Sequence, residues 1–129
     1  MDKNKILLVD DEPVTALAEA SQLEKYDFAV EIVNNGREAI HFIEKDEDVN
    51  LILMDIELND ELDGIETAKK IQANQDIPVL FLTAHEDPEF LNRTQSMQTY
   101  NYLLKDTSGP MLANAIHQAL KLHSAQEKI

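Results

Sequence analysis

The chain has 129 residues, and its 11 basic and 25 acidic side chains give a formal charge of −14. This length suits one compact domain that needs neither disulfide nor metal to fold, and the absence of cysteine excludes thiol catalysis and cysteine zinc sites. The acidity argues against nucleic acid or anionic membranes as direct partners. No apolar run exceeds four or five residues, so we expect a soluble, cytoplasmic protein without a membrane-spanning segment.

Strand and helix patterns alternate from the start of the chain. The continuous apolar run 6–9 predicts a strand buried on both faces, and Pro13 opens a helix. The apolar face expected for this helix consists of Val14, Leu17, Ala18 and Leu23. Alternation over 28–32 predicts a second, less buried strand, which 34–36 (Asn-Asn-Gly) ends. A second helix then carries Ala39, Ile40 and Ile43, and the acidic residues 46–48 end it.

The middle of the chain repeats this pattern. The apolar run 51–54 predicts a third strand, and an acidic loop closed by Gly64 leads to a third helix. That helix carries Ile65, Ala68 and Ile71 on its apolar face. The run 79–82 predicts a fourth buried strand. Asp87 as N-cap and Pro88 in the first turn predict the start of a fourth helix, which carries Phe90, Leu91 and Met97.

A fifth strand over 100–104 and a final helix complete the pattern. Ser108 or Gly109 is expected to cap that helix, whose apolar residues are Leu112, Ala115, Ile116, Ala119, Leu120 and Leu122. Five strand–helix units in strict alternation predict an α/β fold, with a parallel sheet, right-handed crossovers and helices on both faces. The buried central runs favour an open, doubly wound sheet, and no composition break divides residues 1–129 into two domains.

Polar residues stand directly after four of the five predicted strands. They are Asp10, Asp11 and Glu12 after the first, Asp55 after the third, Thr83 after the fourth and Lys105 after the fifth. Each alone is most simply interpreted as a turn, cap or surface residue. In an open α/β sheet, however, the carboxyl ends of the strands form the ligand crevice, so these groups are expected to converge there.

Such a cluster has a definite chemistry. Adjacent carboxylates repel one another and need a cation to stay ionised, and oxygen ligands without histidine or cysteine suit Mg²⁺. A carboxylate can itself accept a phosphoryl group as an aspartyl phosphate. A metal ion and a lysine would then neutralise the charge that builds up during phosphoryl transfer.

These residues lie in motifs that resemble the receiver domain of two-component and phosphorelay signalling. The motifs are 6–11 (ILLVDD), 51–55 (LILMD), 82–84 (LTA) and 102–105 (YLLK), and the resemblance covers essentially the whole chain. It implies a flavodoxin-like strand order 2-1-3-4-5. It also implies that Asp55 is the phosphoacceptor, supplied by a histidine kinase or a phosphotransfer histidine.

The resemblance assigns a role to each further site residue. Asp10, Asp11, Asp55 and the backbone carbonyl of Glu57 would hold Mg²⁺, and Lys105 would pair with the phosphoryl group. Thr83 and Tyr102 would be the switch residues, since the threonine would move toward the phosphoryl group and the tyrosine would turn inward. The residues that tune phosphoryl access and lifetime would be Glu57, Ala84 and His85.

The output implied by the resemblance is a change in the surface formed by the fourth helix, fifth strand and fifth helix. The expected partners are a histidine kinase or phosphotransfer protein and a downstream protein target or linked domain, and the fourth and fifth helices also offer a face for a homodimer. The chain departs from the family in two places. The loop after Asp55 is one residue longer than the common form, and Asp106 stands where proline commonly follows Lys105.

Alternatives of other classes remain open. A pseudo-receiver would be an interaction module that is never phosphorylated, but it is expected to lose Asp55, Asp11 or Lys105, and all three are present. An aspartate-nucleophile phosphatase is expected to have a second aspartate where Glu57 stands. We therefore predict a phosphorylation switch that takes part in its own Mg²⁺-dependent phosphorylation and is not an enzyme acting on other substrates.

Overall fold

Five parallel strands form the centre of the fold, in the order β2-β1-β3-β4-β5. The computed structural model describes residues 3–127 except 47, 60, 87, 96 and 98, and it describes only the backbone at 99–101 and 127. The strands are β1 (Asn4–Val9), β2 (Phe28–Val33), β3 (Leu51–Asp55), β4 (Val79–Thr83) and β5 (Thr99–Leu104). The predicted doubly wound sheet and its order are confirmed, and each predicted strand is present within one or two residues.

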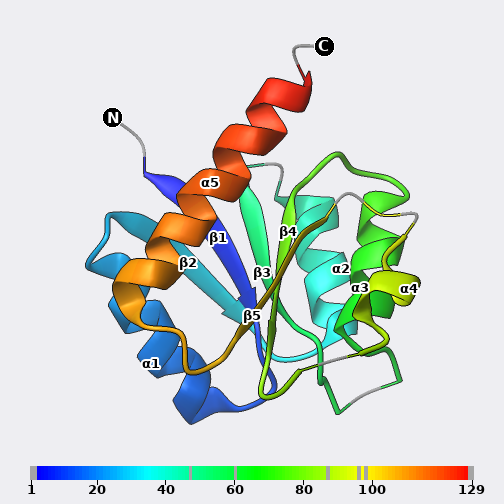
Figure 1. Cartoon of the computed structure of the whole chain (residues 1–129), viewed down its shortest axis with the longest axis horizontal. Helices are drawn as coiled ribbons and strands as arrows, with labels where there is room; N and C mark the ends of the chain where they lie inside the picture. The colour runs from blue at the N-terminus through cyan, green and yellow to red at the C-terminus, as the bar shows by residue number, and fades with distance from the viewer. Residues whose placement is uncertain are drawn as a thin grey trace.

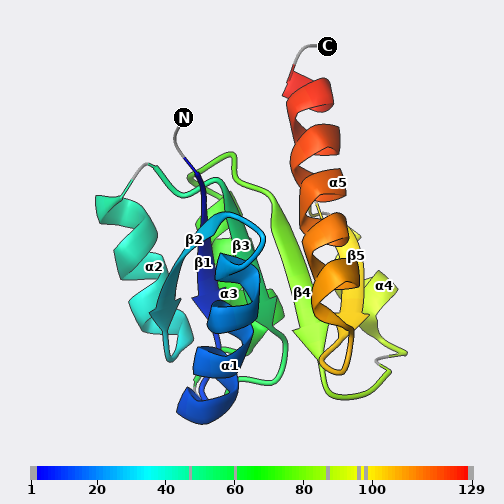
Figure 2. The same ribbon diagram turned by 90° about the vertical axis from the view of Figure 1, so that its left-hand side faces the viewer.

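Five helices connect and follow the strands. They are α1 (Pro13–Glu24), α2 (Gly36–Lys45), α3 (Gly64–Gln72), α4 (Phe90–Arg93) and α5 (Gly109–Glu127). Figure 1 shows α1 and α5 on one side of the sheet and α2, α3 and α4 on the other. In Figure 2 the strand arrows all point to the same end of the molecule, so the loops after β1, β3, β4 and β5 meet there.

Each face of the sheet carries its own apolar core. One cluster joins alternate strand residues such as Leu7 and Ile52 to the inner faces of α2 and α3. The other joins strand residues such as Leu8 and Leu53 to α1 and α5. Because successive strand residues point to opposite faces, the continuous apolar runs of β1, β3 and β4 are buried on both sides.

Side-chain caps fix where α2 and α3 begin. Asn35 accepts a hydrogen bond from the backbone N–H of Glu38 at 2.8 Å and so caps α2. Asp63 and Glu66 form a reciprocal capping box at the start of α3. The residues predicted to end the second strand (34–36) and to close the acidic loop (Gly64) therefore also mark the starts of α2 and α3.

The predicted inner face of α1 is wrong at three of its four positions. Leu23 is buried, but Val14 is 82% exposed, Leu17 is 65% exposed and Ala18 is also exposed. The buried residues are Ala16, Ala20 and Leu23. Small residues at this spacing let the helix pack close to the sheet, and the larger apolar side chains point outward.

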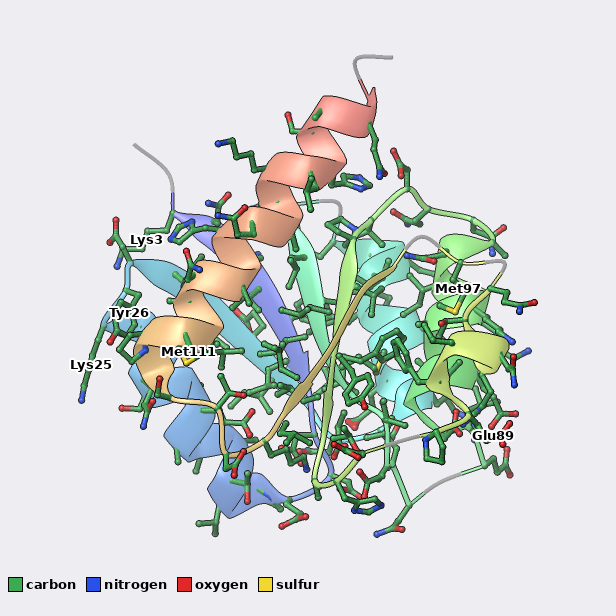
Figure 3. The ribbon with its side chains drawn as sticks, viewed as in Figure 1. Lys3, Lys25, Tyr26, Glu89, Met97 and Met111 are labelled. Carbon is green, nitrogen blue, oxygen red and sulfur yellow. The ribbon has the colours of Figure 1, made fainter. Side chains whose placement is uncertain are left out.

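The fourth helix is shorter than predicted. Helix α4 ends at Arg93, so Met97 lies beyond it, half-buried against the α2–α3 core cluster (Figure 3). Phe90 is buried, whereas Leu91 is 76% exposed. Glu89 precedes the helix as its N-cap, Pro88 lies in the turn before it, and the predicted cap Asp87 lies outside the described residues.

The last helix follows the prediction with one exception. Leu112, Ile116 and Ala119 are buried against the sheet, whereas Leu122 is 51% exposed near the end of α5. Among the described residues, none of the helices combines the length and the hydropathy needed to cross a bilayer.

Candidate functional site

Three carboxylates meet at the carboxyl edge of the sheet. Asp10 follows β1, Asp11 comes next, and Asp55 is the last residue of β3. One oxygen from each lies within 4.8 Å of the others, and Asp10 and Asp55 are each only 1% exposed. The adjacent β1 and β3 place these residues side by side because the two strands are parallel and paired from Ile6–Leu51 onward.

Lys105 supplies the positive charge of this cluster. Its Nζ donates a hydrogen bond to Asp55 Oδ2 at 2.9 Å and lies 3.9 Å from Asp10 Oδ2. The backbone N–H of Lys105 donates to the Thr83 carbonyl at 2.8 Å, which holds the loop after β5 against the end of β4. The lysine is therefore fixed from both its backbone and its ammonium group.

Burial shapes the charge of the cluster. It raises the pKa of Asp10 and Asp55, and the mutual repulsion of the carboxylates adds to this effect, while Lys105 opposes it. Burial would lower the pKa of Lys105, but the hydrogen bond and charge of Asp55 outweigh it and raise that pKa. Asp10 Oδ2 is buried and has no hydrogen-bond partner among the described residues. The cluster thus holds an excess of acceptor oxygens in a poorly solvated place.

Glu12 does not join the cluster. Its side chain is exposed, its carboxylate lies 3.4 Å from the Thr15 hydroxyl, and its backbone N–H donates to Asp10 Oδ1 at 2.9 Å. Of the six residues predicted at the strand ends, the structure therefore brings together Asp10, Asp11, Asp55 and Lys105, with Thr83 at the neighbouring strand end.

Glu57 spans the gap between the loop after β3 and the end of β4. Its Oε1 accepts hydrogen bonds from the Thr83 hydroxyl and, at 2.9 Å, from the backbone N–H of Ala84. His85 Nδ1 lies 3.8 Å from Glu57 Oε2. Burial opposes ionisation of Glu57, yet the hydrogen bonds from Thr83 and Ala84 outweigh it and lower the pKa of that carboxyl. The three residues expected to tune phosphoryl access thus form one connected group.

The Thr83 hydroxyl has two acceptors within reach. Besides Glu57, the carbonyl of His85 lies 2.9 Å from Thr83 Oγ1, and Thr83 is 1% exposed. A hydroxyl has a single proton to donate, so it serves one acceptor at a time. Tyr102, the other predicted switch residue, is half-buried, and its ring centroid lies 4.8 Å from that of Phe90 in α4.

Two features of the site lay beyond the sequence prediction. The backbone N–H of Asn59 donates to Asp11 Oδ2 at 2.9 Å, so the acidic loop after β3 closes onto the cluster. The carboxylate of Glu57 reaches Thr83, whereas the sequence assigned Glu57 a metal-binding carbonyl and a tuning role only. No residue pattern encodes either contact, since both depend on the path of the loop.

The fold and site place the chain in a known family. A family model described as the response regulator receiver domain matches residues 6–117. The chain therefore belongs to the receiver domain family and is a receiver domain of the two-component response regulator type.

The relatives of the chain are consistent with this family. Transcriptional regulatory protein YdfI of Bacillus subtilis (strain 168) is 30% identical over 120 residues, which cover 92% of this chain and 55% of YdfI. Regulatory protein AtoC of Escherichia coli (strain K12) is 29% identical over 127 residues, which cover 98% of this chain and 27% of AtoC. The chain thus spans between about a quarter and just over half of the length of these relatives.

Solved structures show the same architecture. The N-terminal domain of a response regulator/sensory box/GGDEF three-domain protein from Carboxydothermus hydrogenoformans has a TM-score of 0.89 and 37% identity, covering 95% of this chain and 98% of that one. The signal receiver domain of a modulated diguanylate cyclase from Desulfovibrio desulfuricans G20 has a TM-score of 0.87 and 29% identity, covering 97% and 99%.

Proposed function

We propose that the chain is a phosphorylation-dependent signalling switch in which Asp55 accepts a phosphoryl group. The observation that carries this proposal is the contact of 2.9 Å between Asp55 Oδ2 and Lys105 Nζ inside a buried group of three carboxylates. A buried carboxylate paired with an ammonium group is both a nucleophile and a place where added negative charge is compensated. Membership in the receiver domain family supports the same role.

Mg²⁺ fits the donor set of this site. The ligands would be Asp10, Asp11, Asp55 and the backbone carbonyl of Glu57, all hard oxygen donors. The buried Asp10 Oδ2 without a hydrogen-bond partner is the oxygen that such an ion would satisfy, directly or through a water molecule. When bound, Mg²⁺ would neutralise part of the charge on the phosphoryl oxygens.

In the proposed signalling step the phosphoryl donor is a phosphohistidine, for which acetyl phosphate can substitute in vitro. An Asp55 carboxylate oxygen forms the new O–P bond while the P–N bond of the donor breaks. The leaving imidazole keeps the electron pair of that bond and takes up one proton. Lys105 remains hydrogen-bonded at the reacting carboxyl and compensates the charge that the phosphoryl group adds.

The switch involves the end of β4 and the side chain of Tyr102. A phosphoryl oxygen would compete with Glu57 for the Thr83 hydroxyl, and movement of Thr83 would let Tyr102 turn inward. Because Tyr102 packs on Phe90 of α4, this change would reach the surface formed by α4, β5 and α5. Glu57, Ala84 and His85 would tune the access and lifetime of the phosphoryl group.

The partners follow from this role. A histidine kinase or phosphotransfer protein would supply the phosphoryl group, and a downstream protein target or a linked domain would read the α4–β5–α5 surface. A second copy of the chain is a further candidate for that surface. We also propose that residues 1–129 form a single receiver domain that acts on no other substrate as an enzyme.

Intact mass after incubation with acetyl phosphate, with and without Mg²⁺, tests the proposal. We expect one phosphoryl adduct that depends on Mg²⁺ and is missing from Asp55→Asn. The matched control is Asp76→Asn, an exposed aspartate before β4 at the opposite edge of the sheet, which should keep the adduct. An adduct retained by Asp55→Asn would contradict the assignment of Asp55 as phosphoacceptor. No adduct in any condition, with acetyl phosphate left unconsumed, would contradict the proposal and favour the pseudo-receiver.

A further inference from the structure

A cavity lies behind the phosphorylation site, between α1 and the start of α5. Its volume is about 230 Å³, larger than the cavity of about 150 Å³ that accepts benzene in an engineered protein. Glu19 of α1 and Lys105 both line it, and the leucines at its wall are Leu82, Leu104 and Leu112. Lys105 therefore borders two spaces, the carboxylate crevice and this cavity.

Glu19 is an unusual residue for such a place. Its Oε2 atom is buried and has no hydrogen-bond partner among the described residues. Burial, followed by the negative charge of Asp10, raises the pKa of Glu19 to about 7, and Lys105 is the group that opposes this rise. A carboxyl group with this pKa changes its charge near neutral pH, which an ordinary glutamate does not do.

The charges around Glu19 come from three strands and the start of its own helix. Asp10 follows β1, Glu12 precedes α1, Asp55 ends β3, and Lys105 follows β5. Helix α5 presents the apolar Leu112 to the cavity. Lys105 is the cation among these groups: it donates a hydrogen bond to Asp55 and acts on Glu19 through its charge, so both carboxyl groups depend on it.

We propose that Glu19 is a positioning residue for Lys105, and that its protonation state sets how far the ammonium group is available to a phosphoryl group on Asp55. This inference rests on the proposed function. Ionised Glu19 competes with Asp55 for the lysine, whereas protonated Glu19 leaves the lysine to the crevice. Phosphorylation adds negative charge at Asp55 and therefore favours transfer of one proton from solvent to the Glu19 carboxylate.

The first test observes Glu19 in the unphosphorylated protein. Side-chain carboxyl carbon-13 NMR over a pH titration should give Glu19 a midpoint close to neutral, and Lys105→Met should raise that midpoint by about one pH unit because the shared cation is lost. A midpoint near the ordinary glutamate value, or one that Lys105→Met leaves unchanged, would overturn the inference. This result does not depend on whether Asp55 is phosphorylated.

The second test compares phosphorylation rates from acetyl phosphate in wild type and Glu19→Gln, each measured at about pH 6 and about pH 8. We expect the ratio of wild-type to variant rate to fall by about fivefold between these values, which corresponds to about 1 kcal/mol. Glu24→Gln removes an exposed carboxylate at the other end of α1 and should show no such fall. A ratio independent of pH would overturn the coupling between Glu19 and the phosphorylation of Asp55. A wild type that accepts no phosphoryl group would contradict the proposed function, and the NMR titration would then decide whether Glu19 and Lys105 are coupled.

Discussion

Gly64, the first residue of α3, lies against the backbone of Asp55 so closely that a single methyl group should destabilise the protein. A Cβ at Gly64 would lie 2.0 Å from the Asp55 carbonyl oxygen and 2.8 Å from Ile56 Cα. An ordinary contact is about 3.4 Å, so the oxygen would have to move by roughly 1.4 Å. The φ angle of Gly64 is not positive, so the restriction is one of space.

The size of the effect follows from what the methyl group meets. The clashing atoms belong to the backbone at the end of a central strand, and they have no rotamer by which to move aside. Overpacking of a well-packed core costs about 1–3 kcal/mol, and we expect Gly64→Ala to lose about 3 kcal/mol of unfolding free energy. That is a large part of the 5–15 kcal/mol typical of a domain.

Gly109→Ala is the matched control. Its Cβ would lie 2.6 Å from Gln22 Oε1, the tip of a flexible side chain that can turn away. Urea unfolding followed by circular dichroism should therefore place Gly109→Ala within about 1 kcal/mol of wild type. If Gly64→Ala lost no more stability than this control, the predicted clash with the Asp55 backbone would be wrong.

Three further predictions concern side chains around the site. The pKa of Glu19 in the folded protein is about 7, against an ordinary 4.5. Its contribution to folding stability is therefore fully present below about pH 4.5 and is lost as the pH rises through 7. That difference corresponds to at most about 3.4 kcal/mol, and solvent screening reduces it. Glu19→Gln should therefore be more stable than wild type by about 1–2 kcal/mol at pH 8 and nearly equal at pH 4.5. Urea unfolding that shows no pH-dependent gain would contradict this. Glu57→Ala should free the Thr83 hydroxyl and so strengthen binding of beryllofluoride, a phosphoryl mimic, by about fivefold in a Mg²⁺ buffer, as measured by calorimetry. Weaker binding would show that the Glu57 carboxylate supports binding of the mimic instead of competing with it for Thr83. Arg93→Ala should lower the free energy of unfolding by about 0.5–1 kcal/mol, because the partly buried ion pair of Arg93 with Asp63, at 2.6 Å, joins α4 to the cap of α3. Arg37→Ala removes an exposed ion pair and should cost almost nothing. Equal losses of the two variants in thermal unfolding would contradict this prediction.

The sequence predicts the sheet well because a strand that is buried on both faces has a continuous run of apolar residues. The apolar runs of β1, β3 and β4 admit few other interpretations, and strict alternation with helices sets a parallel arrangement. Helix α1 shows the opposite case. Val14 and Leu17 share a helical face just as Ala16 and Ala20 do, and only packing against the sheet decides that the small residues point inward.

The site is predictable as far as strand ends determine it. Asp10, Asp55 and Lys105 meet because parallel strands bring their carboxyl ends to one edge. The contact of Glu57 with Thr83 depends on the course of a loop, which residue types do not specify. The sequence gives only a weak indication of Glu19, an acidic residue on the same helical face as the buried Ala16 and Leu23. Its relation to Lys105 can be recognised only from the cavity that both residues line.

The phosphoryl group is expected on Asp55 itself. A phosphoryl group on a carboxylate is an acyl phosphate, which borohydride reduces to an alcohol, so a phosphorylated aspartate becomes homoserine. We predict that peptide mass spectrometry after phosphorylation with Mg²⁺ and borohydride reduction finds homoserine at position 55 and at no other aspartate. Homoserine at another position, or an unmodified Asp55 in protein whose intact mass carries the adduct, would contradict the assignment of Asp55 as phosphoacceptor.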